Sequence, residues 1–166
     1  MNSNKNITLT DDEKQFLSLF TQASFLPVSK FVLKSSKSDH LESVALAPVY
    51  LYGTTDSLDA VKNIGQIITR LSERNIIFLD YETPLKNCDY SSHEQSDVYA
   101  LLKEIVAEGQ ADPNFVFDST ELQFGGMSLT RIGRKIAGIH HPGSSNYKPN
   151  PRGKIRVKVR IKRARS

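Results

Sequence analysis

Apolar residues recur at helical spacing most clearly between Ser57 and Arg74. They fall at steps of three and four along this segment, which predicts a helix with one buried face. Asn75 tolerates the left-handed backbone conformation and is predicted to end this helix. A β-strand is predicted directly after it, over residues 76–81.

Two further helices are predicted before this one. Thr10 and Glu13 have the spacing of a capping box, and an apolar face of helical period follows them, so a helix is predicted over 10–24. Pro27 is favourable in a first helical turn, where its missing N–H would have no partner. A short second helix is therefore predicted over 27–35.

Three segments near these helices have no clear helical period. Residues 1–9 are polar and are predicted to be disordered, and residues 35–43 are predicted to form a loop. The apolar stretch 44–52 contains Pro48, which argues against a central strand. This stretch is left open between a helix and a short strand.

The C-terminal half alternates short elements and turns. Ser91 and Glu94 have a second capping-box spacing and predict a helix that reaches Glu108. The remaining expectations are short strands over 115–117 and 121–124, a chain break at Gly125 and Gly126, and a final strand and helix over 127–139 with Thr130 as a cap.

The charge of the chain is unevenly distributed. The 166 residues carry a net charge of +4, yet residues 148–166 contain nine Lys/Arg and no acid. The other 147 residues therefore hold thirteen basic and eighteen acidic side chains, a net charge of −5. Residues 10–141 are predicted to form one mildly acidic domain with an acidic insertion over 82–124, followed by a linker and basic arm over 142–166.

Composition excludes several classes of protein. No apolar run approaches the roughly 20 residues of a membrane span, and the N-terminus lacks the apolar stretch of a signal peptide. A soluble, cytoplasmic protein is therefore expected. The single cysteine, Cys88, excludes an internal disulfide.

The basic arm is suited to a polyanion, and nucleic acid is the favoured one. Apolar and basic residues alternate from Lys154 to Lys162, so an extended arm would place β-branched side chains on one side and cations on the other. Lysine and arginine near phosphates release counterions and give affinity with little sequence information. A solvated tail, an edge strand and a membrane-surface contact remain alternatives. The residues proposed to bind phosphate are Arg152, Lys154, Arg156, Lys158, Arg160, Lys162, Arg163 and Arg165.

The polar face of the 57–74 helix carries hydrogen-bond donors. If this helix lay in a major groove, its side chains would reach base edges or phosphates. On the helix alone, an ordinary solvated face is the simpler interpretation. The candidate residues are Lys62, Asn63, Gln66, Thr69 and Arg70.

Two motifs resemble those of winged-helix DNA-binding proteins, in particular MarR-type and PadR-type transcription regulators. Residues Leu71 to Ile77 match the end of a recognition helix and the opening of a wing, and Leu129 to Arg134 match the segment that closes the wing. The resemblance implies an α+β, helix-dominated winged helix, with 10–24 and 27–35 as supporting helices. It also implies that the 57–74 helix reads DNA.

The chain departs from that family pattern in two ways. Asn75 stands where the family usually has glycine. Some 50 residues separate the two motifs, and they include a predicted helix and a net charge of −8. An acidic wing would be repelled by phosphate, so this enlarged wing insertion is expected to point away from DNA.

Enzymatic chemistry has little support in the sequence. Cys88, Asp89 and His93 lie close together but lack a zinc-ligand spacing, and no phosphate-binding glycine loop is present. Asp80 and Glu82 lie at a predicted strand end without a partner base or nucleophile. A non-enzymatic protein without a cofactor or metal is therefore expected.

The leading hypothesis is a winged-helix regulator that binds double-stranded DNA through the 57–74 helix and the basic arm. The 82–124 insertion would serve as a homodimer or partner surface, with its apolar residues in the core or at that interface. One alternative is a winged-helix module for protein–protein contacts. Another is an RNA-binding or ribosome-associated protein.

Overall fold

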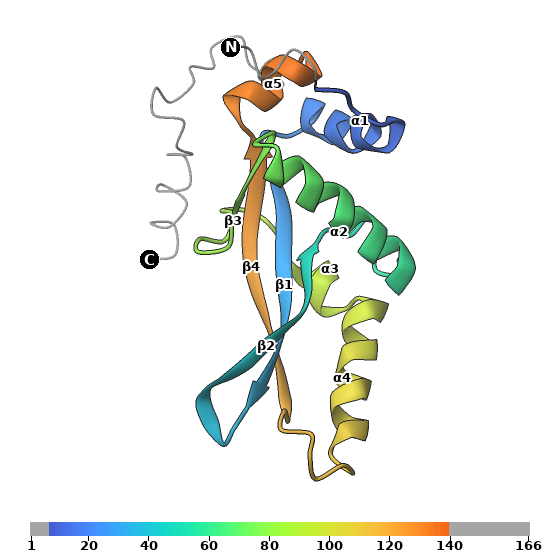
Figure 1. Cartoon of the computed structure of the whole chain (residues 1–166), viewed down its shortest axis with the longest axis vertical. Helices are drawn as coiled ribbons and strands as arrows, with labels where there is room; N and C mark the ends of the chain where they lie inside the picture. The colour runs from blue at the N-terminus through green and yellow to red at the C-terminus, as the bar shows by residue number, and fades with distance from the viewer. Residues whose placement is uncertain (1–6, 140–166) are drawn as a thin grey trace.

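The computed structural model describes residues 7–139, which form a four-stranded antiparallel sheet with helices packed against it (Figure 1). The strand order is β2-β1-β4-β3, and the sheet curls into a half-barrel. The elements are α1 (Asp11–Leu17), a 3₁₀ turn (Ser18–Thr21), β1 (Leu26–Ser35), β2 (Ser38–Val49), α2 (Leu58–Glu73), β3 (Ile77–Asp80), α3 (Ser91–Glu94), α4 (Asp97–Gly109), β4 (Ser119–Leu129) and α5 (Arg131–Ala137).

The predicted winged helix is wrong, because the second supporting helix does not exist. Residues 27–35 lie in β1, a central strand that pairs with β2 on one edge and β4 on the other. Val28 and Phe31 belong to the two different core clusters. A strand that is covered on both faces reads as an apolar run without alternation, so its sequence resembles a short helix.

The β1–β2 hairpin also replaces the loop predicted over 35–43. β2 runs from Ser38 to Val49, so most of that segment and the undecided stretch after it are extended. Side chains in the first part of β2 are largely exposed. Pro48 fits this element because β2 is an edge strand, and an edge strand tolerates a missing N–H.

The two motifs that suggested a wing do meet in space. β3 pairs antiparallel with the end of β4, with Ile77 opposite Leu129. However, β4 also pairs with β1 over nine positions, from Met127 to Ser119. The feature is therefore the edge of a larger mixed α/β fold instead of a two-stranded wing.

The helix predicted from Ser91 to Glu108 is interrupted. It consists of the single turn α3 and the separate helix α4, whose N-cap is Ser96. Ser96 Oγ accepts from the Tyr99 N–H at 3.1 Å, so the predicted cap at Ser91 is wrong. The predicted strand over 115–117 is also absent, whereas 121–124 lies within β4.

The break predicted at Gly125 and Gly126 is wrong, because both residues lie within β4. A Cβ on Gly125 would lie 2.0 Å from the Asp80 carbonyl oxygen. One on Gly126 would lie 2.4 Å from Leu85 Cδ2. Glycine is therefore required here for close approach of neighbouring backbone and side chains.

Several local predictions are confirmed. Thr10 and Glu13 form both hydrogen bonds of the capping box, at 3.0 and 3.1 Å. α2 begins and ends within one residue of the predicted bounds, and Asn75 has a φ of 62°. Thr130 caps α5 through the Gly133 N–H at 2.8 Å. Each of these signals acts within a few residues, which is why the sequence reveals it.

The main core joins the two ends of the chain to the sheet. α1, the 3₁₀ turn and the C-terminal half of α2 pack on the ends of β1, β3 and β4, and partly buried residues of α5 extend this cluster. Ile7 and Leu9, within the predicted N-terminal tail, also pack against it, whereas residues 1–6 lie outside the described part. A smaller cluster holds α4 to the sheet through Phe31, Val49, Val61 and Val98.

His93 connects α3 to the sheet. Its side chain is 2% exposed, and its Nδ1 lies 2.7 Å from Ser29 Oγ. The rings of Tyr90 and Phe124 contact the imidazole edge-on. Burial lowers the pKa of His93 to about 4, so the ring stays neutral in the folded protein.

This burial makes stability depend on pH. Below its ordinary pKa of 6.5, His93 takes up a proton in the unfolded chain but not in the folded one until about pH 4. We expect the free energy of unfolding to fall by about 2 kcal/mol between neutral pH and about pH 5 through this residue. Urea denaturation of His93→Gln should show that part of the pH dependence removed, whereas the exposed His40→Gln should retain it. An unchanged pH dependence in His93→Gln would contradict the assignment.

Candidate nucleic-acid interface

The polar face of α2 borders a groove. Four of the five residues predicted on this helix line it, together with the end of β2. The helix can approach β2 this closely because Gly65 has no side chain, and a Cβ there would lie 2.9 Å from the Pro48 carbonyl oxygen. The groove residues are Leu46, Ala47, Pro48, Lys62, Gly65, Gln66, Thr69 and Arg70.

The helical period explains which candidates meet there. Lys62, Gln66, Thr69 and Arg70 are spaced by three and four residues and therefore share one side of α2. Asn63 is exposed but does not line the groove. Lys62 and Gln66 are exposed at the groove, where their donors can reach a ligand.

Arg70 has a second role in the fold. Its Nε lies 3.1 Å from Glu13 Oε2, and the Arg74 Nη2 lies 2.7 Å from Glu13 Oε1. Arg74 Nη1 also donates to the Thr8 carbonyl at 3.1 Å. Glu13 is the carboxylate of the capping box, so one buried acid joins the start of α1 to the end of α2. The Arg70 side chain, 48% exposed, is thus held in place at the groove.

These contacts lower the pKa of the Glu13 carboxyl. Burial raises the pKa of its carboxyl, but the Thr10 N–H and the guanidinium groups of Arg74 and Arg70 lower it by more. The net pKa is below the ordinary value of 4.5, so the carboxylate is charged at neutral pH. The two arginines therefore share the one buried carboxylate of Glu13.

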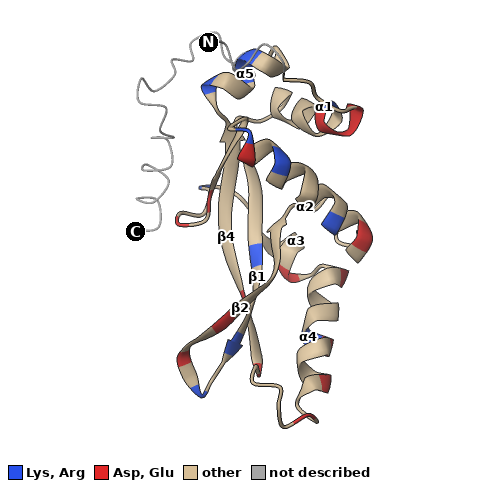
Figure 2. Cartoon of the chain, viewed as in Figure 1, with Lys and Arg blue, Asp and Glu red and all other residues tan. Residues whose placement is uncertain are grey.

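Cations also surround the end of the described chain. α5 carries Arg131, Arg134 and Lys135, and Figure 2 shows basic residues along this helix. Thr130, at its start, donates through Oγ1 to the Asn75 carbonyl at 2.7 Å. α5 therefore begins beside the C-terminal end of α2. By contrast, the stretch from Asp80 to Glu121, which includes α4, holds ten acids and two lysines.

The basic arm itself lies outside the described residues. This holds for every arm residue proposed to bind phosphate: Arg152, Lys154, Arg156, Lys158, Arg160, Lys162, Arg163 and Arg165. The contribution of these residues, and that of the α2 candidates, stays a prediction.

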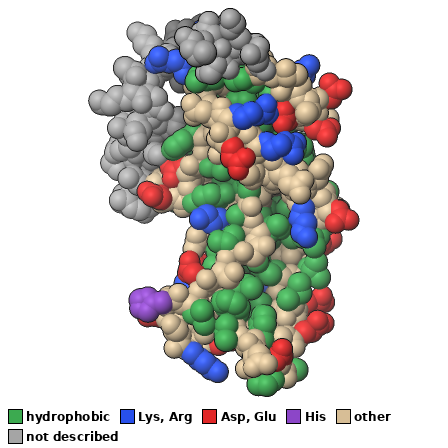
Figure 3. All heavy atoms as spheres, viewed as in Figure 1, with side chains coloured by type: hydrophobic (Ala, Val, Ile, Leu, Met, Phe, Trp, Pro, Cys, Tyr) green, Lys and Arg blue, Asp and Glu red, His purple; other side chains and the backbone are tan. Residues whose placement is uncertain are grey.

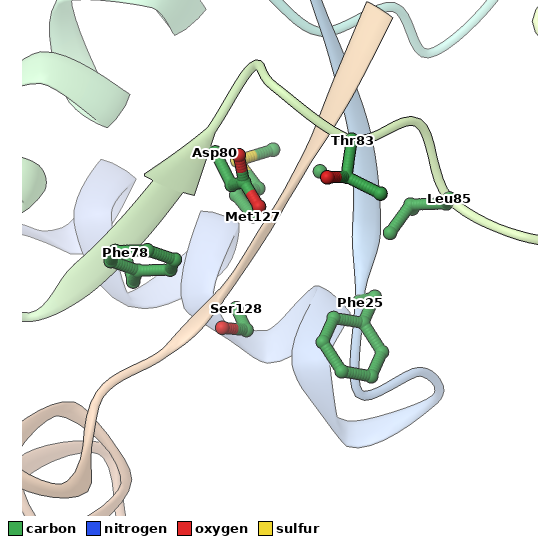
Figure 4. Close-up of a pocket in the computed structure, with 8 residues that line it drawn as sticks. Phe25, Phe78, Asp80, Thr83, Leu85, Met127 and Ser128 are labelled. Carbon is green, nitrogen blue, oxygen red and sulfur yellow. The ribbon is translucent and has the colours of Figure 1, made fainter. Parts of the chain in front are cut away.

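A second hollow was missed by the sequence analysis. It lies on the sheet between Phe25 and Phe78, over the middle strand β4 (Figure 4). Ser128 lies at its base, and Thr83 and Leu85 border it. Phe78 is 39% exposed although it lies in a strand, and the sequence alone does not distinguish it from the buried residues of the same apolar run. Figure 4 shows that the lining comes from several segments of the chain, which no local motif could join.

The residues considered for metal or thiol chemistry do not form a centre. Cys88 and Asp89 line a hollow next to Phe25, whereas His93 is buried against Ser29. Burial raises the pKa of the Cys88 thiol. Among residues 7–139, no group of three His, Cys, Asp or Glu side chains is placed to hold a metal ion.

Comparisons with known proteins add little to these observations. No family model matches the sequence, and no curated protein matches it. One solved structure that the comparisons matched is an uncharacterized protein from the hydrocarbon-degrading marine bacterium Alcanivorax borkumensis SK2. It is 12% identical, with a TM-score of 0.41, and the match covers 78% of this chain and 84% of that one.

None of the helices among residues 7–139 combines the length and the apolar character that crossing a membrane requires.

The Glu13 contacts predict a measurable contribution to stability. Glu13→Gln removes the charge that Arg70 and Arg74 share, and we expect a loss of about 2 kcal/mol in the free energy of unfolding at neutral pH. Because the folded pKa is lowered, the wild-type contribution is present above the ordinary pKa and lost as the pH falls through the folded pKa. Denaturation curves at neutral and acid pH should show the two proteins converging at low pH. Glu104→Gln, at an exposed position on α4, serves as the control, and an equal loss there would contradict the interpretation.

Proposed function

We propose that this protein binds nucleic acid. The observation that carries the proposal is that four hydrogen-bond donors of α2 gather along one groove: Lys62, Gln66, Thr69 and Arg70. The cations of α5 follow Thr130, which bonds the C-terminal end of α2. The basic arm comes after α5 in the sequence, beyond a linker.

The arm supplies most of the affinity in this proposal. Each of its cations that neutralises a phosphate releases condensed counterions, which favours binding without regard to sequence. The fold, with a net negative charge, cannot supply this attraction by itself. The arm is therefore the principal phosphate contact.

In this proposal the groove orients the bound nucleic acid on the fold. Arg70 is held by Glu13, so it loses less side-chain freedom on binding a phosphate than a free arginine would. Lys62 adds a charge about two turns away along the helix, and the amide of Gln66 lies between them. The acidic α4 region repels phosphate and limits how nucleic acid can lie on the surface.

Double-stranded DNA is the first ligand to test, with single-stranded DNA and RNA as competitors. The helix α2 forms one side of a groove whose other side is β2, and its Arg70 is engaged with Glu13. Binding is therefore expected to depend on phosphates more than on base edges. A regulator of transcription would use such binding at its target sites.

Binding across a salt series tests the proposal. For a duplex, the logarithm of the affinity should fall linearly with the logarithm of salt concentration, by about 0.9 for each phosphate neutralised. Removal of residues 148–166 should abolish most of that slope. Lys62→Ala in the full chain should lower the slope by about one, whereas Lys37→Ala, on the distant hairpin turn, should not. No binding of duplex, single strand or RNA by the full chain at low salt would refute the proposal.

A second candidate function is protein–protein contact through α4. Leu101 and Ile105 lie one turn apart and are 37% and 47% exposed, and Val116 is 47% exposed. Val98, on the same helix, is buried in the smaller core, and Leu102 packs against it. Figure 3 shows hydrophobic side chains gathered over the part of the molecule formed by the hairpin and α4. Such a patch favours a partner or a second copy of the chain.

This candidate predicts self-association that α4 controls. The mass measured by light scattering should rise with protein concentration and return to that of a monomer in Leu101→Lys/Ile105→Lys. The same pair of changes should leave nucleic-acid affinity per chain within about threefold, because neither Leu101 nor Ile105 lines the groove. A monomer at all concentrations would exclude the homodimer.

A further inference from the structure

The exposed side of α4 carries apolar and acidic residues in two neighbouring rows. Leu101 and Ile105 form the apolar row and are 37% and 47% exposed. Glu104 and Glu108 form the acidic row, and both are exposed. Residues three and four apart share one side of a helix, so the two rows lie next to each other. We name these four residues the α4 strip.

The acidic row of the α4 strip has no cation beside it within the described part of the chain. None of the ion pairs among residues 7–139 involves a residue of α4. Lys103, the single base in the sequence of α4, lies over the Tyr99 ring, with its Nζ 5.0 Å from the ring centroid. Like charges four residues apart destabilise a helix slightly. A cation beside Glu104 and Glu108 would therefore stabilise α4.

The apolar row continues onto the β1–β2 hairpin. Leu41 and Val44 of β2 are 37% and 52% exposed. Figure 3 shows hydrophobic side chains gathered over α4 and the hairpin, with acidic side chains along the margin. A ligand for this surface therefore needs an apolar side and positive charge.

The C-terminal arm has the complementary pattern. From Lys154 to Lys162, five cations alternate with four β-branched residues, and no acid interrupts them. In an extended chain, every second residue recurs after about 6.7 Å. On a helix, residues four apart recur after about 6 Å. An extended arm laid along α4 would therefore keep its β-branched side chains at the apolar row and its cations at the acidic row over two successive pairs.

The arm is long enough to reach α4 of its own chain. Ile139, the last described residue, packs against the main core, which includes Leu129 at the end of β4. α4 is attached further along β4, where the Tyr99 hydroxyl lies 2.7 Å from Thr120 Oγ1. Leu129 and Thr120 are nine positions apart, which is about 30 Å in a strand. Residues 140–153 number fourteen, and a chain of that length can span up to about 46 Å.

We propose that residues 154–162 dock along the α4 strip of the same chain, an inference that rests on the contact through α4 proposed above and names its occupant. The β-branched side chains cover Leu101 and Ile105, and the cations lie beside Glu104 and Glu108. Charge alone does not select α4, because the fold carries other acids, so the apolar row is what selects it. Phosphates compete for the same cations, and the arm therefore leaves α4 when it binds nucleic acid.

A spin label beside the docked segment tests the contact in the full chain. Cys88→Ser removes the native thiol, and a nitroxide is attached through Ala164→Cys. The nitroxide weakens the amide signals of nearby residues in an NMR spectrum of the isotope-labelled protein. We expect the signals of α4 to lose intensity while those of α1 keep theirs. Undiminished signals throughout α4 would overturn the proposal.

Charge reversal on α4 shows whether the acidic row holds the arm. Glu104→Lys/Glu108→Lys should restore the α4 signals in the spin-labelled chain. Glu73→Lys/Glu82→Lys makes the same change of charge at exposed positions outside α4 and should leave the loss of intensity as it was. Equal recovery in both pairs would mean that the arm responds to net charge only, which contradicts docking at α4.

A change in the arm itself tests the apolar row. Val157→Ser/Val159→Ser keeps every cation, so it should bind phosphate as before, yet it should restore most of the α4 intensity. An unchanged loss of intensity in this variant would overturn the apolar contact.

Mixing two preparations separates a contact within one chain from a contact between chains. A spin-labelled chain without isotope, mixed with an isotope-labelled chain without the nitroxide, should leave the α4 signals intact. Loss of α4 intensity in this mixture would overturn docking within the chain and favour the homodimer instead. A monomer in light scattering excludes that homodimer but agrees with the docked arm. The NMR measurement contains no nucleic acid, so its outcome does not depend on nucleic-acid binding.

Discussion

Strand β4 can lie between β1 and β3 only because its residues 125 and 126 have no side chains. The Asp80 backbone occupies the position where a Cβ of Gly125 would be, and Leu85 occupies that of Gly126. The Tyr90 hydroxyl spans the same place, because it bonds both the loop and β4. This close contact positions β3 and the loop that follows it. It also places Phe78 level with Ser128, and α5 beside the end of α2.

The helical parts of the fold could be predicted because their signals are local. The capping box at Thr10, the left-handed Asn75 and the cap at Thr130 each act through neighbours within a few residues. β1 could not be identified in this way, because its two faces are covered by different core clusters and one of its edges pairs with β4, some 90 residues away. The winged-helix resemblance rested on the two motifs around β3 and the end of β4. It correctly placed β3 beside the end of β4, but it gave no information about β1, which pairs with the other edge of β4.

The same distinction applies to the candidate sites. Lys62, Gln66, Thr69 and Arg70 share a groove because a helix places every third and fourth residue on one side, so the sequence was enough to group them. The link between Arg70 and Glu13 was not visible, because it joins residues 57 positions apart. The hollow between Phe25 and Phe78 is lined by segments that are not consecutive in the chain. Only the register of the sheet brings its residues together.

The groove and the arm would respond differently to salt. Attraction between the arm and phosphates is weakened as salt rises, because it depends on the release of counterions. Hydrogen bonds from Gln66 and Thr69 in the groove would involve uncharged side chains and are screened far less. In a protein whose fold is acidic and whose arm is basic, affinity at low salt therefore reports mainly the arm. Discrimination that persists at high salt, after the arm has weakened, reports the part of the surface that contacts the bases.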